Sequence, residues 1–126
     1  MKTALASYPR SGNTWMRYML EVATGQDSGS VYNDRILPRN GDGVVIKTHM
    51  LNWQDYDRAI HMVRNPFDAI ESYWFWWLDV YGAREPDWDD HVRDCLLGYD
   101  SWHFHTKVWA GDARIPRPLI RYEDVH

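Results

Sequence analysis

The chain has 126 residues, of which 44% are hydrophobic and 25% are charged, and its formal net charge is −4. This length and composition are typical of one globular domain and argue against a second domain or a disordered chain. The negative charge gives no support for general nucleic-acid binding, which requires a basic surface that neutralises many phosphates. Because no apolar run approaches about 18 residues, we expect no membrane segment. The single cysteine and the lack of a signal-peptide pattern favour a cytoplasmic chain.

The N-terminal third predicts a strand, a helix and a long connection. Residues 2–8 form an apolar run of strand length that ends at Pro9. Apolar spacing over 13–24 predicts a helix that ends at Gly25. Its expected apolar stripe consists of Trp15, Met16, Met19, Leu20 and Ala23. Residues 25–43 are polar and rich in turn formers, so they predict an irregular connection of a length that often forms a functional lid.

The remaining elements continue the alternation of strands and helices. Two β-branched apolar runs predict strands at 43–49 and 58–64. Asn65 and Pro66 have the form of a helix start, and they predict a helix that runs to Gly82. The other expected elements are a helix from Trp88 ended by Gly98, a helix from Trp102 ended by Gly111, and a strand from about Pro118 to Tyr122.

This alternation predicts an α/β fold with three layers. A parallel sheet of about four strands would be covered by helices on both faces, in a single domain over residues 1–126. Ligands in such sheets bind at the carboxyl ends of the strands. That rule points to four segments: Tyr8 to Asn13, Lys47 to His49, Arg64 to Asn65, and Tyr122 to Asp124.

The turn between the first strand and the first helix, SYPRSGNTW at residues 7–15, predicts an anion site. Its N–H groups and the helix N-terminus would face one ligand, and Gly12 permits a close turn. Arg10 supplies a planar cationic fork, and the hydroxyls of Ser11 and Thr14 add donors. Taken alone, the loop is also consistent with a capped turn beside a solvated arginine. The pattern lacks the Gly-Lys-Ser/Thr ending of ATP-binding P-loops and a following Mg²⁺ ligand, which weakens an ATP-hydrolysing interpretation.

SYPRSGNTW resembles the phosphosulfate-binding loop of sulfotransferases, in which a strand is followed by Tyr-Pro-(Lys/Arg)-Ser-Gly-Thr-Thr-Trp and a helix. The segment from Arg64 to Ser72 resembles the 3′-phosphate site of the same family, with an arginine that ends a strand and a serine eight residues later. Lys47-Thr48-His49 resembles the family's Lys-Thr/Ser-His segment. The resemblance implies a P-loop NTPase-like sulfotransferase core, 3′-phosphoadenosine 5′-phosphosulfate (PAPS) as co-substrate, and a transfer for which no metal is expected.

The resemblance also implies roles for individual residues. His49 would remove the acceptor proton, Lys47 would stabilise charge on the transferring group, and Arg10 would neutralise the leaving phosphate. The residues implied to bind the nucleotide are Arg10, Ser11, Gly12, Asn13, Thr14, Trp15, Arg64, Ser72 and Tyr122. Trp15 resembles the tryptophan that stacks on adenine and Tyr122 a tyrosine near the base, although both also fit a core. Independently, strand alternation places Lys47 and His49 on one face, and an imidazole that titrates near ~6.5 accepts a proton at neutral pH.

The segments SYPRSGNTWMRYMLE, VVIKTH, VRNPFDAI and RYEDV are most similar to the sulfotransferase region of WSC-domain proteins, and this likeness spans nearly the whole chain. Family members usually continue past the last strand to an Arg-Lys-Gly-type loop that closes on the 3′-phosphate and the base. This sequence stops at His126, so the resemblance implies a C-terminally short domain.

Three interpretations of function remain open. The leading one is a sulfotransferase that moves a sulfuryl group from PAPS to a hydroxyl or amine of a small-molecule, glycan or protein acceptor. The second is a non-catalytic relative that binds the nucleotide, and the third is a P-loop kinase that uses ATP and Mg²⁺. We expect no nucleic-acid or membrane partner. The aromatic run from Tyr73 to Trp77 predicts an acceptor wall or an interface for self-association or another protein.

Overall fold

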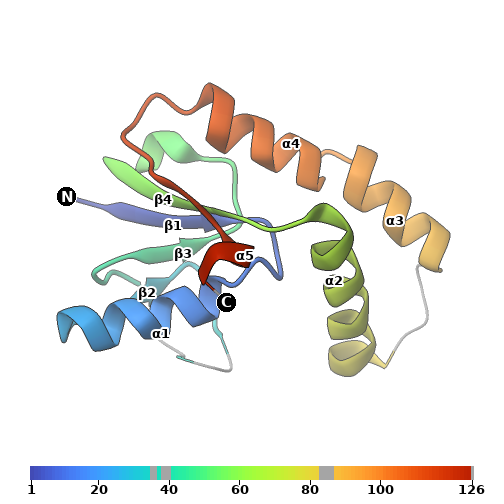
Figure 1. Cartoon of the computed structure of the whole chain (residues 1–126), viewed down its shortest axis with the longest axis horizontal. Coiled ribbons are helices and arrows are strands. Elements are labelled where there is room, and N and C mark those ends of the chain that lie inside the picture. Colours follow the sequence, from blue (N-terminus) through green and yellow to red (C-terminus); the bar gives the residue numbers. More distant parts are fainter. Residues whose placement is uncertain (35–36, 38–40, 83–86, 126) are drawn as a thin grey trace.

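The computed structural model of the chain describes residues 1–34, 37, 41–82 and 87–125. In these residues a parallel sheet is built from five strands in the order β2-β3-β1-β4-β5 (Figure 1). The strands are β1 (Thr3–Ser7), β2 (Gly29–Ser30), β3 (Ile46–Thr48), β4 (Arg58–Val63) and β5 (Leu119–Arg121). The predicted α/β class is therefore confirmed. The strand count differs from the expected four because β2, only two residues long, lies in the connection that was expected to be irregular.

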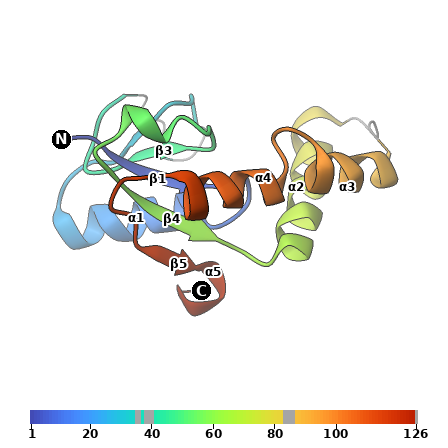
Figure 2. The ribbon, with the colours of Figure 1, turned by 90° about the horizontal axis from the view of Figure 1, so that it is seen from above.

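Helices cover both faces of this sheet. Their bounds are α1 (Asn13–Thr24), η1 (Trp53–Asp55), α2 (Pro66–Tyr81), α3 (Trp88–Leu97), α4 (Trp102–Thr106), η2 (Lys107–Asp112) and α5 (Tyr122–Val125). In Figures 1 and 2, α1 lies on one face, α4 with η2 lies on the other, and α2 and α3 extend beyond the end of β4. The expected helix from Trp102 to Gly111 is divided into α4 and η2. The second part, η2, has a wide π-type turn, in which Ala113 N donates to Val108 O at 2.8 Å.

Side-chain alternation along the strands divides the core into two layers. Ala4 and Ala6 of β1 pack with the fully buried Trp109 on the face covered by η2. Leu5 points to the other face and packs with Met16 of α1 and Met62 of β4. The central strand is buried on both sides, as expected of a parallel sheet, and the functional side chains are left at its ends.

The apolar stripe expected for α1 is partly wrong. Met16 and Leu20 face the sheet, but Trp15 and Met19 are exposed. Ala23 is also exposed. The side chain of Arg17 is instead fully buried, because protein groups satisfy its guanidinium. A charged side chain therefore occupies part of the face that apolar spacing alone assigns to the core.

The connection between α1 and β3 is only partly described. Residues 35–36 and 38–40 of the expected 25–43 segment lie outside the described residues. Within the rest, β2 pairs with β3, and Ser30 forms an isolated bridge with Gly41. In the described residues, no helix combines the length and hydrophobicity needed to cross a bilayer.

Candidate functional site

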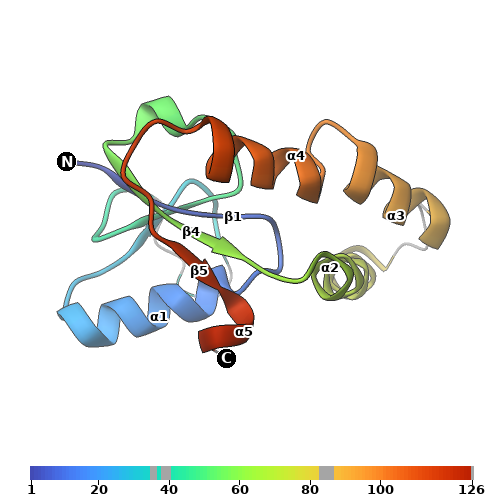
Figure 3. The same ribbon diagram turned by 45° about the horizontal axis from the view of Figure 1, so that its top comes forward.

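The turn between β1 and α1 has the backbone that its sequence requires. Arg10 and Gly12 have φ values of 64° and 86°, in the left-handed region that favours glycine. A Cβ atom at Gly12 would lie 2.5 Å from Cδ2 of Tyr122, which is closer than carbon atoms can approach. Figure 3 shows α5, which begins at Tyr122, beside the N-terminal end of α1. Gly12 is therefore required both for the turn and for the approach of Tyr122.

Three of the predicted site residues, Arg10 from the turn and Arg64 and Ser72 from the later segment, lie together. Arg10 Nε donates to Ser72 Oγ at 3.1 Å, and Arg64 Nη1 donates to the carbonyl of Arg10 at 2.9 Å. The Arg64 guanidinium also lies over the ring of Tyr122, 4.3 Å from its centroid. A pocket of about 320 Å³ opens here, lined by Arg10, Arg64, Asp68, Glu71, Ser72, Phe75, Trp76 and Asp79. The structure thus brings the turn and the segment from Arg64 to Ser72 together.

Two buried donors at this place lack a protein partner among the described residues. They are the hydroxyl of Ser11 and Nε of Arg64. Buried polar atoms are almost always hydrogen-bonded in folded proteins, so an anionic ligand beside Arg64, which lines the pocket, would satisfy donors that the described residues leave unpaired. Both groups are donors, and the adjacent guanidinium groups are cationic. These donors and the two guanidinium groups fit an anionic ligand such as a phosphate or sulfonate, and the carboxylates of Asp68, Glu71 and Asp79 in the same lining oppose it.

Asn13, Thr14 and Trp15 lie in different environments. The side-chain nitrogen of Asn13 donates to Leu5 O at 2.9 Å and to Ser7 Oγ at 3.0 Å, so this amide ties the turn to β1. Trp15 is 49% exposed and stacks on Tyr18 with ring centroids 6.2 Å apart. Thr14 is partly buried. Neither Thr14 nor Trp15 is among the lining residues of the 320 Å³ pocket.

His49 follows the carboxyl end of β3 and is held by the neighbouring strand. Its Nδ1 lies 2.7 Å from the carbonyl oxygen of Ser7, and because a carbonyl only accepts, Nδ1 carries the proton and donates. Nε2 is then the nitrogen with the lone pair. Tyr32 stacks on the imidazole at 5.3 Å, and its hydroxyl accepts from the backbone N–H of His49 at 3.1 Å. The ring is therefore fixed in orientation and in tautomer.

The pKa of His49 is lowered to about 4, mainly by burial and also by the charge of Lys47, whereas the Ser7 carbonyl and Asp34 act in the opposite direction. This value lies well below the ~6.5 of a free imidazole, from which the sequence-based expectation started. Desolvation explains the difference, because a buried ring is less able to carry a charge. His49 is consequently neutral at physiological pH, as a proton acceptor must be, although it is a weaker base than a solvated histidine.

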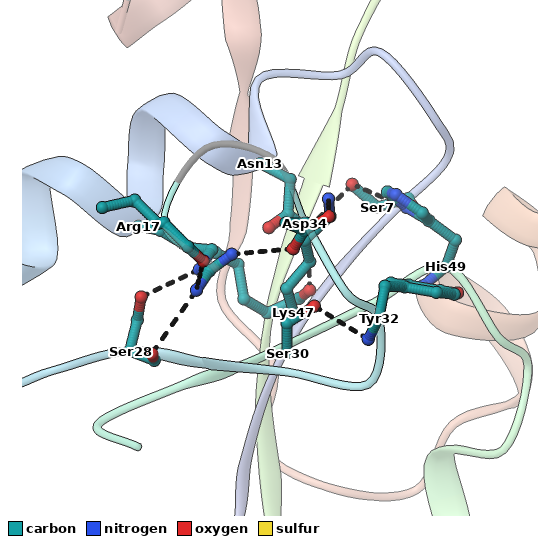
Figure 4. A network of polar contacts seen from close by, with 11 residues as sticks. Ser7, Asn13, Arg17, Ser28, Ser30, Tyr32, Asp34, Lys47 and His49 are labelled. Carbon is teal, nitrogen blue, oxygen red and sulfur yellow. Dashed lines mark hydrogen bonds and ion pairs between the residues drawn. The ribbon is translucent and has the colours of Figure 1, made fainter. Parts of the chain in front are cut away.

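Lys47 is buried and paired within the protein. Its Nζ lies 2.7 Å from Oδ1 of Asp34, and Oδ2 of the same carboxylate lies 2.9 Å from Nη1 of Arg17 (Figure 4). Sequence reasoning missed Asp34 and Arg17. Their ion pair joins a residue of the connection after β2 to a residue of α1. In the sequence, burial of Arg17 is indicated only by its position next to the apolar Met16.

His49, Arg10 and Arg64 lie at one edge of the sheet. β1 pairs with β3 on one side and with β4 on the other, and the three strands end beside one another. Ser7 at the end of β1 contacts His49, and the Arg10 carbonyl contacts Arg64. The turn therefore connects the His49 imidazole to the pocket that Arg10 and Arg64 line.

At the level of class, the fold of the chain has a structural counterpart. Mouse sulfotransferase SULT7A1, in a crystal structure with PAP, matches 98% of this chain and 53% of its own, with a TM-score of 0.69 at 21% identity. Human sulfotransferase 1E1 is 27% identical over a match that covers 96% of this chain and 52% of the human protein. The fold is that of the sulfotransferases. No protein-family model matches the chain.

A more particular similarity is to insect proteins named WSCD family members. Those of Drosophila pseudoobscura and Aedes aegypti are 43% and 44% identical to the chain, over 99% and 98% of its length. The resemblance to the sulfotransferase family, and within it to WSCD proteins, is thereby confirmed. The chain spans about half the length of these relatives, 46% and 45%.

Proposed function

We propose that this chain is a sulfotransferase that moves a sulfuryl group from PAPS to a hydroxyl or amine acceptor. The observation that carries the proposal is the meeting, at one sheet edge, of two arginines beside a pocket, orphaned buried donors and a neutral histidine of fixed tautomer. The arginines supply charge for a phosphorylated nucleotide, and the histidine supplies a base. The fold shared with a sulfotransferase that was crystallised with PAP supports the same donor class.

Binding of the PAPS nucleotide is assigned to Arg64 and to the turn between β1 and α1, which contains Arg10. Arg64 offers a planar fork and its orphaned Nε to the 3′-phosphate, and Ser72 adds a neutral hydroxyl. Ser11 and the backbone of the turn bind the 5′-phosphosulfate. Arg10, already directed toward Ser72, neutralises the phosphate that leaves. Trp15 and Tyr122 are assigned to the nucleotide's base.

The chemical step assigned to His49 is removal of the acceptor proton. Nε2 accepts this proton as the acceptor oxygen or nitrogen bonds to sulfur, while the bond between sulfur and the phosphate oxygen breaks. Adenosine 3′,5′-bisphosphate is the second product. Lys47 has three N–H donors, one of which binds Asp34, so the same ammonium can also stabilise an anionic transferring group. In this scheme the protein contributes position and electrostatics.

Transfer of a radiolabelled sulfuryl group across hydroxyl and amine acceptors of the small-molecule, glycan and protein classes tests the proposal. We expect His49→Ala to lower transfer by about a hundredfold or more, as is typical for loss of a general base. Affinity for adenosine 3′,5′-bisphosphate should stay within about twofold, since His49 binds no phosphate here. The matched control is His103→Ala, at an exposed position of α4, which should transfer normally.

Other outcomes favour the competing interpretations. Tight bisphosphate binding without transfer to any acceptor class would indicate a non-catalytic relative. Preference for ATP with a Mg²⁺ requirement would indicate a kinase. Undiminished transfer by His49→Ala would remove His49 from its assigned role.

A further inference from the structure

The segment that follows β2 contacts both groups assigned to the chemical step. Tyr32 stacks on the His49 ring and accepts a hydrogen bond from its backbone N–H. Two residues later, Asp34 Oδ1 binds Lys47 Nζ at 2.7 Å. Figure 4 shows the two contacts side by side, with Asp34 between Lys47 and Arg17. The segment is therefore placed to fix the relative position of Lys47 and His49.

Arg17 anchors the Asp34 carboxylate to the body of the protein. The arginine is fully buried in α1, where its Nε donates to Ser28 Oγ at 2.8 Å and its Nη2 donates to Leu37 O at 3.0 Å. Its Nη1 donates to Asp34 Oδ2 at 2.9 Å. A planar guanidinium held at several nitrogens cannot rotate freely. Asp34 is thus attached to α1 through one oxygen and to Lys47 through the other.

The Asp34 carboxylate lies between two cations, Lys47 and Arg17. Burial alone raises the pKa of the Asp34 carboxyl, but hydrogen bonds from Lys47 and Ser30 and the charges of Lys47 and Arg17 outweigh it, so the pKa lies below its ordinary value. Asp34 is therefore ionised, between two cations. Without it, two buried like charges would repel each other, and the flexible lysine side chain would turn toward solvent.

From these contacts we infer that Asp34 is a positioning residue, which holds the Lys47 ammonium beside His49 so that it meets the transferring anionic group. Arg17 fixes the carboxylate and takes no part in the chemistry. The part of this inference that concerns transfer rests on the proposed function. The restraint on Lys47 does not, and it can be measured without turnover.

Competitive acetylation, read by mass spectrometry, measures that restraint directly. The chain has three lysines, and Lys2 and Lys107 are exposed internal references. We expect Lys47 to react at least about tenfold more slowly than either reference, because the reaction needs a free amine that is open to solvent. Asp34→Asn should raise the Lys47 rate relative to both references. Asp42→Asn, an exposed position in the same connection, should leave it unchanged.

Kinetics then test the link between restraint and transfer. We expect Asp34→Asn to lower kcat about tenfold, with the affinity for adenosine 3′,5′-bisphosphate within about twofold. In a Lys47→Met background the same substitution should have no further effect on kcat, because Asp34 acts only through Lys47. Asp34→Glu should recover part of the loss. Equal losses in both backgrounds would contradict the inference.

Removal of Asp34 leaves Arg17 buried without its carboxylate and could prevent folding. A second measurement therefore keeps Asp34 in place: titration of its carboxyl carbon by NMR in the wild type and in Lys47→Met. The pKa of Asp34 should rise in the variant, since one of its two cationic partners is lost. An unchanged Asp34 titration, or wild-type labelling of Lys47 as fast as that of Lys2, would overturn the inference whether or not the chain transfers sulfate. Faster labelling of Asp34→Asn with unchanged kcat would also overturn it.

Discussion

The candidate site has two sides, the pocket with Arg10 and Arg64 and the strand end with Lys47 and His49. They differ in how many of their polar atoms have hydrogen-bond partners within the protein. On the pocket side, Arg10 is exposed and Arg64 retains an unpartnered buried Nε among the described residues. On the other side, Lys47 and His49 have specific protein partners at 2.7 Å. A group that binds a ligand must keep its donors for that ligand, whereas groups that act on a reacting atom need to be oriented in advance. The comparison predicts that changes in the pocket alter affinity and that changes on the other side alter rate.

Gly12→Ala should produce the largest effect on the pocket side. The new Cβ would lie 2.5 Å from Tyr122 Cδ2 at a residue whose φ is 86°, so the turn, Tyr122 or both must move. We expect a loss of adenosine 3′,5′-bisphosphate affinity of about a hundredfold, measured by calorimetry, because the turn and the Arg64 stack on Tyr122 are disturbed together.

Gly25→Ala is the matched control for this substitution. Gly25 also has positive φ, 65°, but nothing lies within 4 Å of an added Cβ. It should cost about 1 kcal/mol of stability and leave binding unchanged. Equal losses of affinity in both variants would show that backbone strain alone, and not the contact with Tyr122, is responsible.

Acid should destabilise the protein through its buried histidines. Burial lowers the pKa of His49 and His61 to about 4 and that of His105 to about 3. In the unfolded chain these histidines bind protons near pH ~6.5, whereas in the folded chain they stay neutral until the pH is much lower. The stability is therefore fully present above pH ~6.5 and is lost as the pH falls toward about 4. Each histidine should contribute about 1.4 kcal/mol per pH unit to the slope in this window.

Urea unfolding between pH 7 and pH 4 measures that slope. His105→Phe should reduce it by about one proton, since the ring nitrogens of His105 have no hydrogen-bond partner among the described residues and a phenyl ring replaces them without loss. His103→Phe is the control at an exposed position two residues away. A slope that does not change with His105→Phe would place the acid sensitivity elsewhere.

The smallest effect is expected for Trp15→Ala. Its ring is half exposed and stacks on Tyr18, so it is free to contribute one face to a base. Loss of such a stack should weaken adenosine 3′,5′-bisphosphate about tenfold and leave inorganic pyrophosphate unaffected, as calorimetry can show. Equal weakening of both ligands would mean that Trp15 supports the turn and does not contact the base.

The sequence predicted the strands and helices that have a strong apolar period or a clear stop signal. α1 and α2 end at Gly25 and Gly82 as expected, and the parallel order follows from the alternation of elements. β2 was missed because a two-residue strand of glycine and serine has no apolar period. The end of β5 was misplaced by one residue, since Tyr122 begins α5. Local pattern thus determined the long elements and failed for those that depend on tertiary pairing.

The same limit applies to the candidate site. The contact of Arg10 with Ser72 agrees with the proximity that the two motifs implied, because both follow the ends of strands. The pairing of Lys47 with Asp34 and the tautomer of His49 depend on atoms brought together by the fold, one of them a backbone carbonyl. No residue type or spacing in the sequence identifies such partners. Motifs located the site, and only the structure supplied its internal contacts.

Calorimetry with two nucleotides measures whether this sheet edge binds an adenosine nucleotide through its 3′-phosphate. Adenosine 3′,5′-bisphosphate and adenosine 5′-monophosphate are titrated, without Mg²⁺, into the wild type, Arg64→Ala, and the exposed control Arg93→Ala. We predict that Arg64→Ala weakens the bisphosphate by about 2 kcal/mol and the monophosphate by much less, while the control binds both normally. Equal weakening of both nucleotides by Arg64→Ala, or no bisphosphate binding by the wild type, would contradict the account.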